Sequence, residues 1–332
     1  MNALLDIRKL STYFYTGEGI VKAVDDVSLR IKEGETVCVV GESGCGKSVT
    51  AMSVMGLLPE PSGRVVSGEI RFDGQDIRQW SKEQLRRLRG NEIAIVFQEP
   101  MSAMNPVLTI GKQMTEPLRE HLHLKEAAAR AKAVELLQLV GIPRAEAILN
   151  AYPHELSGGM LQRVMIATAL ACGPRLLIAD EPTTALDVTI QAQILDILHQ
   201  VKEEMHTAIL LITHDLGIVA EMADYVVVMY AGKIVEEAPV EELFDHPQHP
   251  YTQGLLRSKP VLHQRRKMLY SIPGQVPNPL ELGSSCYFYD RCDQRTEACR
   301  TAHPELRRTA PDHHVACWLY GEGEERHERS ID

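Results

Sequence analysis

The sequence predicts an α/β fold built on parallel strands, followed by a small cysteine-containing C-terminal extension. Two observations predict the main fold. Short apolar strands alternate with helical patterns over roughly the first 255 residues, and one of these strands runs directly into a glycine-rich loop. A third observation sets the end apart, because four of the seven cysteines fall in the last fifth of the chain. We therefore expect one domain over residues 1–255 and an extension over residues 256–332.

Composition limits the possible partners. The 332 residues are 44% hydrophobic and carry a net charge of −10, so the overall field does not favour nucleic acid. The basic clusters at residues 86–89 and 265–267 are short and are interpreted as solvated faces. No apolar stretch approaches the roughly 18 residues of a membrane helix, and the N-terminus lacks the features of a secretory signal. The protein is expected to stay in the cytoplasm and to bind no nucleic acid.

The predicted strands and helices follow from apolar patterns. A long helix is indicated by residues 190–201, where isoleucine, leucine and valine recur on one face that we expect to pack on the sheet. Strand signals vanish between about residues 101 and 171, and an alanine-rich helix over residues 125–140 ends at Gly141, which predicts a helical insert. A proline-rich stretch over residues 260–279 is interpreted as a linker. The buried-strand candidates are residues 37–40, 93–97, 176–179, 208–213 and 225–229.

The first strand leads into the sequence GESGCGKS, which matches the phosphate-binding pattern G-x-x-x-x-G-K-[ST] in its required place between a strand and a helix. The three glycines let backbone N–H groups point at phosphate oxygens, and the following helix directs its positive end at the same charge. Lys47 is expected to reach the β- and γ-phosphates of ATP, and the Ser48 hydroxyl to bind Mg²⁺. The predicted nucleotide contacts here are Gly41, Glu42, Ser43, Gly44, Cys45, Gly46, Lys47, Ser48 and Val49.

A pair of carboxylates follows the strand at residues 176–179. Asp180 and Glu181 stand at the carboxyl end of that strand, where ligands of open α/β sheets collect. Asp180 is placed to hold Mg²⁺ through water, which leaves Glu181 to polarise the attacking water. A strand that ends in Asp-Glu could also be a simple helix cap, but the phosphate-binding loop upstream favours the catalytic interpretation.

The sequence LSGGM at residues 156–160, about twenty residues before Asp180, resembles the signature of the ATP-binding cassette family. The resemblance implies that Ser157, Gly158 and Gly159 contact the γ-phosphate bound by an opposite subunit, so that two cassettes sandwich two nucleotides. Met160 stands where the family usually has Gln. We expect little effect, because serine and backbone N–H groups hold the phosphate.

Further motifs follow in the family's order over residues 5 to 250. Gln98 looks like the glutamine that joins Ser48 and Asp180 at Mg²⁺, Asp187 like the D-loop aspartate, and His214 like the switch histidine. Phe14 would stack on adenine, with Tyr13 as the alternative. The resemblance implies a RecA-like mixed sheet core, an antiparallel β region and an α-helical subdomain at about residues 101–171, with Glu181, His214 and Gln98 as catalytic residues.

Within the family, four segments are similar to the ATPases of dipeptide and oligopeptide importers: residues 97–106, 152–156, 181–193 and 249–256. This resemblance implies a heterodimer with a second related ATPase, two membrane permeases and an extracytoplasmic peptide-binding protein. The chain would then lie peripherally on the cytoplasmic face of the inner membrane, which it contacts only through the permeases. Other cargo (nickel chelate, heme or glutathione), an exporter motor and a soluble non-transport cassette protein stay as alternatives.

The cysteine tail does not match the common C-x₂-C zinc spacing. A cluster of four cysteines in a reducing cytoplasm suggests a metal before it suggests disulfides. The importer ATPases carry a similar cysteine set, and the resemblance implies a [4Fe-4S] cluster held by four thiolates. Zinc and free thiols stay open as alternatives. The predicted ligands are Cys286, Cys292, Cys299 and Cys317.

Overall fold

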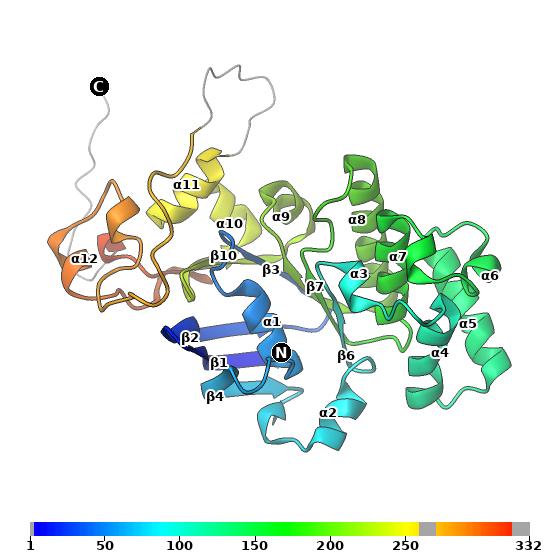
Figure 1. The fold of residues 1–332 in the computed structure, drawn as a ribbon. Coiled ribbons are helices and arrows are strands. Elements are labelled where there is room, and N and C mark those ends of the chain that lie inside the picture. Colours follow the sequence, from blue (N-terminus) through cyan, green and yellow to red (C-terminus); the bar gives the residue numbers. More distant parts are fainter. Residues whose placement is uncertain (1–2, 259–269, 321–332) are drawn as a thin grey trace.

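The computed structural model describes residues 3–258 and 270–320, which form two β-sheets surrounded by helices (Figure 1). The larger sheet has the strand order β11-β12-β10-β9-β3-β8-β7-β6. Neighbours from β9 to β6 run parallel, and all five of these strands were predicted from their apolar runs. Their bounds are Tyr225–Tyr230 (β9), Thr36–Val40 (β3), Ala208–Ile212 (β8), Leu176–Asp180 (β7) and Ile93–Val96 (β6).

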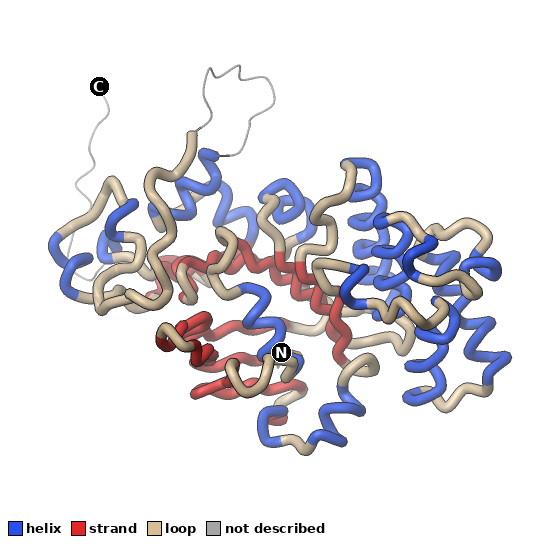
Figure 2. The backbone as a smooth tube through the Cα atoms, in the orientation of Figure 1, coloured by secondary structure: helices blue, strands red, loops and turns tan. Residues whose placement is uncertain are grey.

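The smaller sheet is antiparallel and has the order β2-β1-β4-β5. Its strands are β1 (Leu5–Thr16), β2 (Gly19–Ile31), β4 (Gly63–Phe72) and β5 (Gln75–Asp76). Helix α1 (Lys47–Met55) contacts β1 and β2 of this sheet and also β7 of the larger sheet. The helix therefore lies between the two sheets, as Figures 1 and 2 show. Because α1 follows the phosphate-binding loop, both sheets fix the position of that loop.

The chain between β6 and β7 folds into helices at one end of the molecule (Figure 1). The expected alanine-rich helix is α5, and Gly141, with φ 69°, closes its end by donating from its backbone N–H to Gln138 O at 2.9 Å. Helix α5 presents Ala129, Ala133 and Leu137 to the core. The bounds of the helices in this region are Pro100–Ala103 (α3), Ile110–His121 (α4), Glu126–Leu139 (α5), Ala145–Ile148 (α6) and Gly158–Ala169 (α7).

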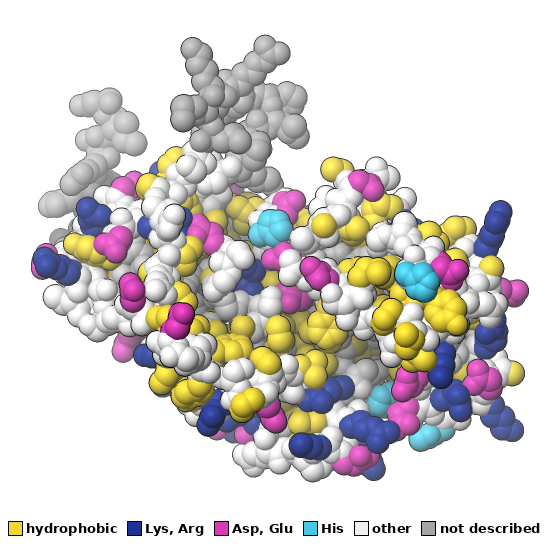
Figure 3. Space-filling model, viewed as in Figure 1, with side chains coloured by type: hydrophobic (Ala, Val, Ile, Leu, Met, Phe, Trp, Pro, Cys, Tyr) yellow, Lys and Arg dark blue, Asp and Glu magenta, His cyan; other side chains and the backbone are white. Residues whose placement is uncertain are grey.

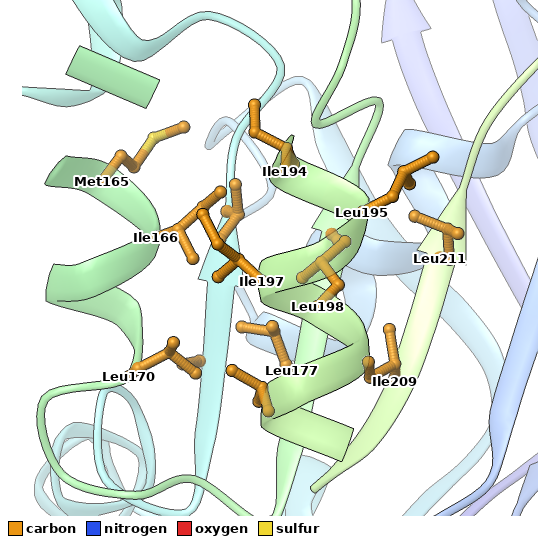
Figure 4. Packing of buried hydrophobic residues seen from close by; sticks show 14 of the residues in the cluster. Met165, Ile166, Leu170, Leu177, Ile194, Leu195, Ile197, Leu198, Ile209 and Leu211 are labelled. Atoms are coloured by element: carbon orange, nitrogen blue, oxygen red, sulfur yellow. The ribbon is translucent and has the colours of Figure 1, made fainter. Parts of the chain in front are cut away.

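The long helix predicted over residues 190–201 is α8 (Val188–Met205). Its buried face packs between α7 and the strands β7 and β8 (Figure 4). Ile194, Ile197, Leu198 and Val201 are buried as predicted. Ile190 is only half-buried and faces Gly159 at the start of α7 instead. The remaining helices before the tail are α2 (Lys82–Leu88), α9 (Leu216–Met222), α10 (Val240–Asp245) and α11 (Pro250–Ser258).

The C-terminal extension continues the larger sheet. Strand β12 (His313–Val315) pairs antiparallel with β10 (Lys233–Pro239), and β11 (Arg307–Ala310) pairs with β12. The extension thereby covers the unpaired groups that β10 would expose as an edge strand. The sequence boundary near residue 255 therefore does not separate two sheets. The other regular elements of the extension are a 3₁₀ turn at Tyr289–Arg291, α12 (Glu297–Thr301) and a 3₁₀ turn at Trp318–Tyr320.

Surface charges are mixed. On the face in Figure 3, basic side chains are interspersed with acidic ones. In the cluster at residues 86–89, Arg87 pairs with Glu83 at 3.3 Å and Arg86 with Glu120, while Arg89 donates to the carbonyl of Met55 at 2.7 Å. The cluster at residues 265–267 and part of the predicted linker lie outside the described residues. Within residues 3–258 and 270–320, no helix combines the length and the apolarity needed to cross a membrane.

Candidate nucleotide-binding and catalytic site

The loop at residues 41–46 connects the central strand β3 to α1 and has room only for glycine at two positions. A Cβ atom on Gly41 would lie 2.2 Å from the carbonyl oxygen of Met229, and one on Gly46 would lie 2.3 Å from that of Ala23. Both glycines have positive φ, 153° and 104°, which side chains disfavour. The close packing explains why the glycines of the motif are needed at these places.

Lys47 is buried, with 5% of its surface exposed, and its ammonium folds over the loop. Its Nζ donates to the carbonyl oxygens of Gly41 at 2.8 Å and Glu42 at 3.1 Å. A buried ammonium needs such acceptors, because an unpaired charge is costly away from water. The lysine therefore lies where the motif predicts the phosphates, and its present partners are neutral carbonyl oxygens that charged phosphate oxygens can replace.

Ser48 and Asp180 meet although 132 residues separate them. The Ser48 hydroxyl donates to Asp180 Oδ1 at 3.0 Å. Asp180 is 6% exposed, and burial, together with the charge of Glu181, raises its pKa above the ordinary value, against the opposing effects of Ser48 and Lys47. The negative charge of this buried carboxylate is only partly balanced by its neighbours, which fits a site for a hard cation such as Mg²⁺.

Three polar side chains converge on one oxygen of Glu181. Gln98 Nε2 donates to Glu181 Oε2 at 3.0 Å, the Thr184 hydroxyl donates to it at 2.9 Å, and His214 Nδ1 lies 3.4 Å away. Glu181 itself has φ 47°, a strained conformation for a residue with a side chain. The predicted residues Gln98, Glu181 and His214 are thus brought together. Thr184 was not predicted, although it stands only three residues after Glu181.

The signature lies apart from this cluster. Ser157 caps α7 by accepting from the backbone N–H of Met160 at 3.4 Å, and Asp187 caps α8 by accepting from that of Ile190 at 3.0 Å. Within the described part of the chain, no hydrogen bond joins Ser157, Gly158 or Gly159 to the phosphate-binding loop. The described residues therefore show no hydrogen-bonded link between the two predicted phosphate sites.

The two aromatic candidates for adenine stacking point to different neighbours. Phe14 on β1 is half-buried and covers Gly63, where a Cβ atom would lie 2.8 Å from Phe14 Cε1. The Tyr13 hydroxyl instead donates to Asp25 at 3.0 Å, which raises the pKa of Tyr13 to about 12 together with the larger effect of burial. Tyr13 is therefore already engaged, which favours Phe14 as the aromatic available to a base.

Two residues near the loop were missed by the sequence analysis. The Tyr251 hydroxyl accepts from the backbone N–H of Glu42 at 2.8 Å, and the guanidinium of Arg291 binds both oxygens of the Glu42 carboxylate at 2.7 and 2.9 Å. These partners are 209 and 249 residues from Glu42 in the sequence. No local pattern could have linked them to the loop.

The four tail cysteines line one small cavity, together with His249 and Phe288. Burial raises the pKa of Cys286 to about 11 and of Cys317 to about 12, and the neighbouring cysteines add to both shifts. In the ranges that the structure describes, however, no group of three or more Cys, His, Asp or Glu side chains is arranged to hold a metal ion. The predicted metal site is therefore not preformed around a single point.

Comparisons with known proteins agree with this geometry. The family model "ABC transporter" matches residues 24–184, and "Oligopeptide/dipeptide transporter, C-terminal region" matches residues 235–299. The chain is 50% identical to the oligopeptide transport ATP-binding protein AppD of Bacillus subtilis, over 97% of this chain and 98% of the relative. It is 46% identical to the dipeptide transport ATP-binding protein DppD of Escherichia coli, over 95% and 96%.

Solved structures give the same fold. A dimeric ATP-binding cassette, MJ0796, in a post-hydrolysis state with ADP and Pi, superimposes with a TM-score of 0.65 at 28% identity and covers 71% of this chain and 98% of that one. The structure of cbiO1 from Clostridium perfringens superimposes with a TM-score of 0.61 at 28% identity, over 74% and 92%. The first of these proteins is an ATP-binding cassette, and the second is part of the ABC transporter complex cbiONQ.

Proposed function

Because this chain belongs to the ABC transporter family, as an ATP-binding subunit of the oligopeptide and dipeptide type, we propose that it hydrolyses ATP to drive peptide import through separate membrane permeases. The observation that carries the proposal is the similarity along nearly the whole chain to ATP-binding proteins of oligopeptide and dipeptide transport. The match of the C-terminal region to a peptide-transporter family model adds support, because it lies largely outside the generic cassette.

The proposed chemistry uses the residues gathered at the carboxyl ends of the parallel strands. Lys47 and the backbone N–H groups of the loop hold the β- and γ-phosphates. Ser48, Asp180 and Gln98 would hold Mg²⁺, which would neutralise charge on the phosphates when bound. Glu181 polarises the attacking water, a role typically worth ~10²–10⁴-fold in rate. The polar side chains around Glu181, including that of His214, keep its carboxylate oriented.

A second ATPase subunit would complete the site. The signature residues, with Ser157 as the cap of α7, share no hydrogen bond with the loop of their own chain in the described ranges, which fits a phosphate partner supplied by another subunit. Val188, next to the D-loop Asp187, is 80% exposed, which fits a face that a partner covers. A solved cassette of this fold is dimeric with ADP and Pi bound.

The proposed complex contains a related second ATPase, two permeases and an extracytoplasmic peptide-binding protein, with this chain peripheral on the cytoplasmic face. Met101 and Val107, which follow Gln98 closely, are 53% and 75% exposed. Exposed apolar side chains beside the catalytic site fit a contact through which the permeases sense nucleotide. Vesicles that contain the permeases and this chain should take up peptides only when ATP is supplied on the side of the membrane that the ATPase faces.

Replacing the catalytic base tests the chemistry. Glu181→Gln should lower ATP turnover by at least about 100-fold while ATP still binds. Thr184→Ala, which removes one donor to Glu181 but leaves the carboxylate, should lose much less activity. Steady-state hydrolysis is measured with phosphate release and binding with a titration of MgATP. Normal hydrolysis by Glu181→Gln would refute the assignment of the base.

For the cysteine tail we propose a [4Fe-4S] cluster bound by Cys286, Cys292, Cys299 and Cys317. The shared cavity supports it, because four cysteines gathered in one place can supply the four thiolates of such a cluster. A single zinc ion would need all four sulfur atoms about 2.3 Å from one point. A four-iron cluster binds each thiolate through a different iron, so the sulfur atoms stay further apart.

Metal analysis separates the alternatives for the tail. Protein purified without oxygen should contain about four iron and four sulfide per chain, and Cys292→Ser should lose most of the iron. A matched control is Cys172→Ser, because Cys172 lies outside the tail cavity. Colourless, iron-free and folded wild-type protein would eliminate the cluster, and one zinc per chain would favour the alternative.

A further inference from the structure

A charged side chain of the cysteine tail reaches the phosphate-binding loop. Arg291 lies at the end of the 3₁₀ turn Tyr289–Arg291, one residue before Cys292. Its Nη1 donates to Glu42 Oε2 at 2.7 Å and its Nη2 donates to Glu42 Oε1 at 2.9 Å. This two-point contact is the strong geometry for an arginine–carboxylate pair. Glu42 is the second residue of the loop that cradles phosphate.

Several further contacts hold the guanidinium of Arg291 in this position. Its Nε donates to the carbonyl oxygen of Pro273 at 2.9 Å, and its Nη1 also donates to the Tyr230 hydroxyl at 3.3 Å. Its carbon centre lies 5.7 Å from the ring of Tyr230 and 5.8 Å from that of Phe288. The arginine side chain is 6% exposed. Burial disfavours the charged form of Arg291, yet the hydrogen bonds to Glu42 and Tyr230 raise its pKa above the ordinary value.

Glu42 is held at three points by groups from outside the loop or from its end. Its backbone N–H donates to the Tyr251 hydroxyl at 2.8 Å, its carbonyl accepts from Lys47 Nζ at 3.1 Å, and its carboxylate binds Arg291. The carboxylate is only partly exposed, at 28%. An uncompensated negative charge in the second residue of the loop would repel the triphosphate that the loop must bind.

We propose that Arg291 is a positioning residue for nucleotide binding: it neutralises Glu42 and fixes the phosphate-binding loop, so that the cysteine tail directly supports the affinity for ATP. This inference rests on the proposed nucleotide site, since it assigns Glu42 to the loop that holds the phosphates. It adds a contribution of the tail to ATP affinity beyond whatever the four cysteines bind. Arg291 acts through Glu42 and touches no reacting atom.

The test measures the dissociation constant of MgATP for the full chain by equilibrium titration. Arg291→Ala should raise that constant about 10-fold to 100-fold, as expected when a nearby carboxylate loses its counter-charge in a partly buried site. Arg295→Ala is the matched control: this tail arginine is exposed, stacks on Tyr289 with a 5.4 Å separation and should leave the affinity within about twofold.

A double variant separates charge compensation from a structural role. Arg291→Ala combined with Glu42→Gln should recover at least half of the lost affinity on a logarithmic scale, because the uncompensated charge is gone. Arg291→Lys, which keeps the charge without the two-point contact, should fall between wild type and Arg291→Ala. The maximal hydrolysis rate at saturating ATP should change far less than the dissociation constant.

Several outcomes would overturn the inference. Unchanged MgATP affinity in a folded Arg291→Ala protein would do so, as would a double variant that binds no better than the single one. If Arg291→Ala does not fold, Arg291→Lys with wild-type affinity would count against the proposal in the same way. Lys47→Ala tests the site itself: if it binds MgATP normally, the nucleotide site is wrong, whereas a loss there with normal binding by Arg291→Ala refutes only the role of Arg291.

Discussion

The phosphate-binding loop and the cysteine tail meet at Glu42 but are built in opposite ways. The loop is six consecutive residues between the regular elements β3 and α1, and its shape comes from backbone turns at glycines packed against other backbone atoms. The tail spreads its cysteines over residues 286–317 and contains only short elements, such as the five-residue α12 and the three-residue β12. Side-chain packing and pairing with β10 hold it in place.

This difference predicts where each region is vulnerable. A loop shaped by its backbone should fail when a single carbon atom is added at a crowded position. A tail held by packing should fail when an anchoring side chain is removed, and its failure should spread to the cassette, because both share one sheet and one aromatic cluster. Three experiments test this comparison.

The largest effect is expected in the loop. Gly46→Ala should cost about 3 kcal/mol or more in the free energy of unfolding and abolish MgATP binding, because its Cβ atom would lie 2.3 Å from the Ala23 carbonyl oxygen at φ 104°. Gly44→Ala is the matched control. Gly44 has φ 79°, but nothing lies within 4 Å of its Cβ position, so the expected cost is about 1–2 kcal/mol of backbone strain.

Urea unfolding followed by circular dichroism gives both free energies, and a nucleotide titration gives binding. Equal costs for the two alanine variants would mean that backbone strain alone, and not close packing against β2 and β9, shapes the loop. The comparison between loop and tail would then lose its basis.

The success of prediction from the sequence also differs between the strand-and-loop region and the tail. The five parallel strands are short apolar runs that need no partner to be recognised, and their carboxyl ends converge because parallel strands end on one edge. Motifs that follow those strands therefore meet in space, and local patterns were enough to place Ser48, Asp180, Gln98, Glu181 and His214 near one another.

The antiparallel sheet escaped prediction from the residues alone. Strands β1 and β2 pair with several register shifts, which interrupt the alternation of apolar and polar residues that identifies such strands. The contact between Arg291 and Glu42 could not be predicted either, since it depends on how the tail docks onto the cassette. The clustering of the cysteines indicated a separate tail, but their spacing carries no information about a contact with the loop.

A smaller combined effect, on stability without direct disruption of the phosphate-binding loop, is expected from removing the main anchor of the tail. Phe288 is 3% exposed, and its ring centre lies 5.3 Å from that of Tyr230 and 5.5 Å from that of Tyr251. Phe288→Ala should therefore cost about 3–5 kcal/mol. If tail and cassette unfold together, thermal unfolding stays a single transition with a lower midpoint.

Leu306→Ala is the control, because Leu306 is in the same tail but is 36% exposed and should change stability by no more than about 0.5 kcal/mol. A separate early transition in Phe288→Ala, with the cassette midpoint unchanged, would show that the tail is an independent unit. That result would restore the boundary near residue 255 as a boundary between domains.

The smallest effect concerns the strand pair that joins tail to cassette. Glu237 on β10 stands opposite His314 on β12, and burial raises its pKa to about 7, against the opposing charge of Arg30 and the hydrogen bond of Tyr225. The folded protein thus holds a proton on Glu237 that the unfolded chain, with a pKa near 4.5, releases earlier. The resulting stability is fully present below about pH 4.5 and is lost as the pH rises through about 7.

Glu237→Gln imitates the protonated side chain and should remove this dependence. At pH 5 the variant should be about as stable as wild type, and at pH 8 it should be more stable by about 1–3 kcal/mol. Glu241→Gln, at an exposed position on α10, serves as the control. Because other groups also titrate, only the difference between wild type and variant at each pH counts. A difference in stability between variant and wild type that stays constant from pH 5 to 8 would mean that water reaches Glu237. The pairing of β12 with β10 would then be looser than the backbone packing that holds the loop.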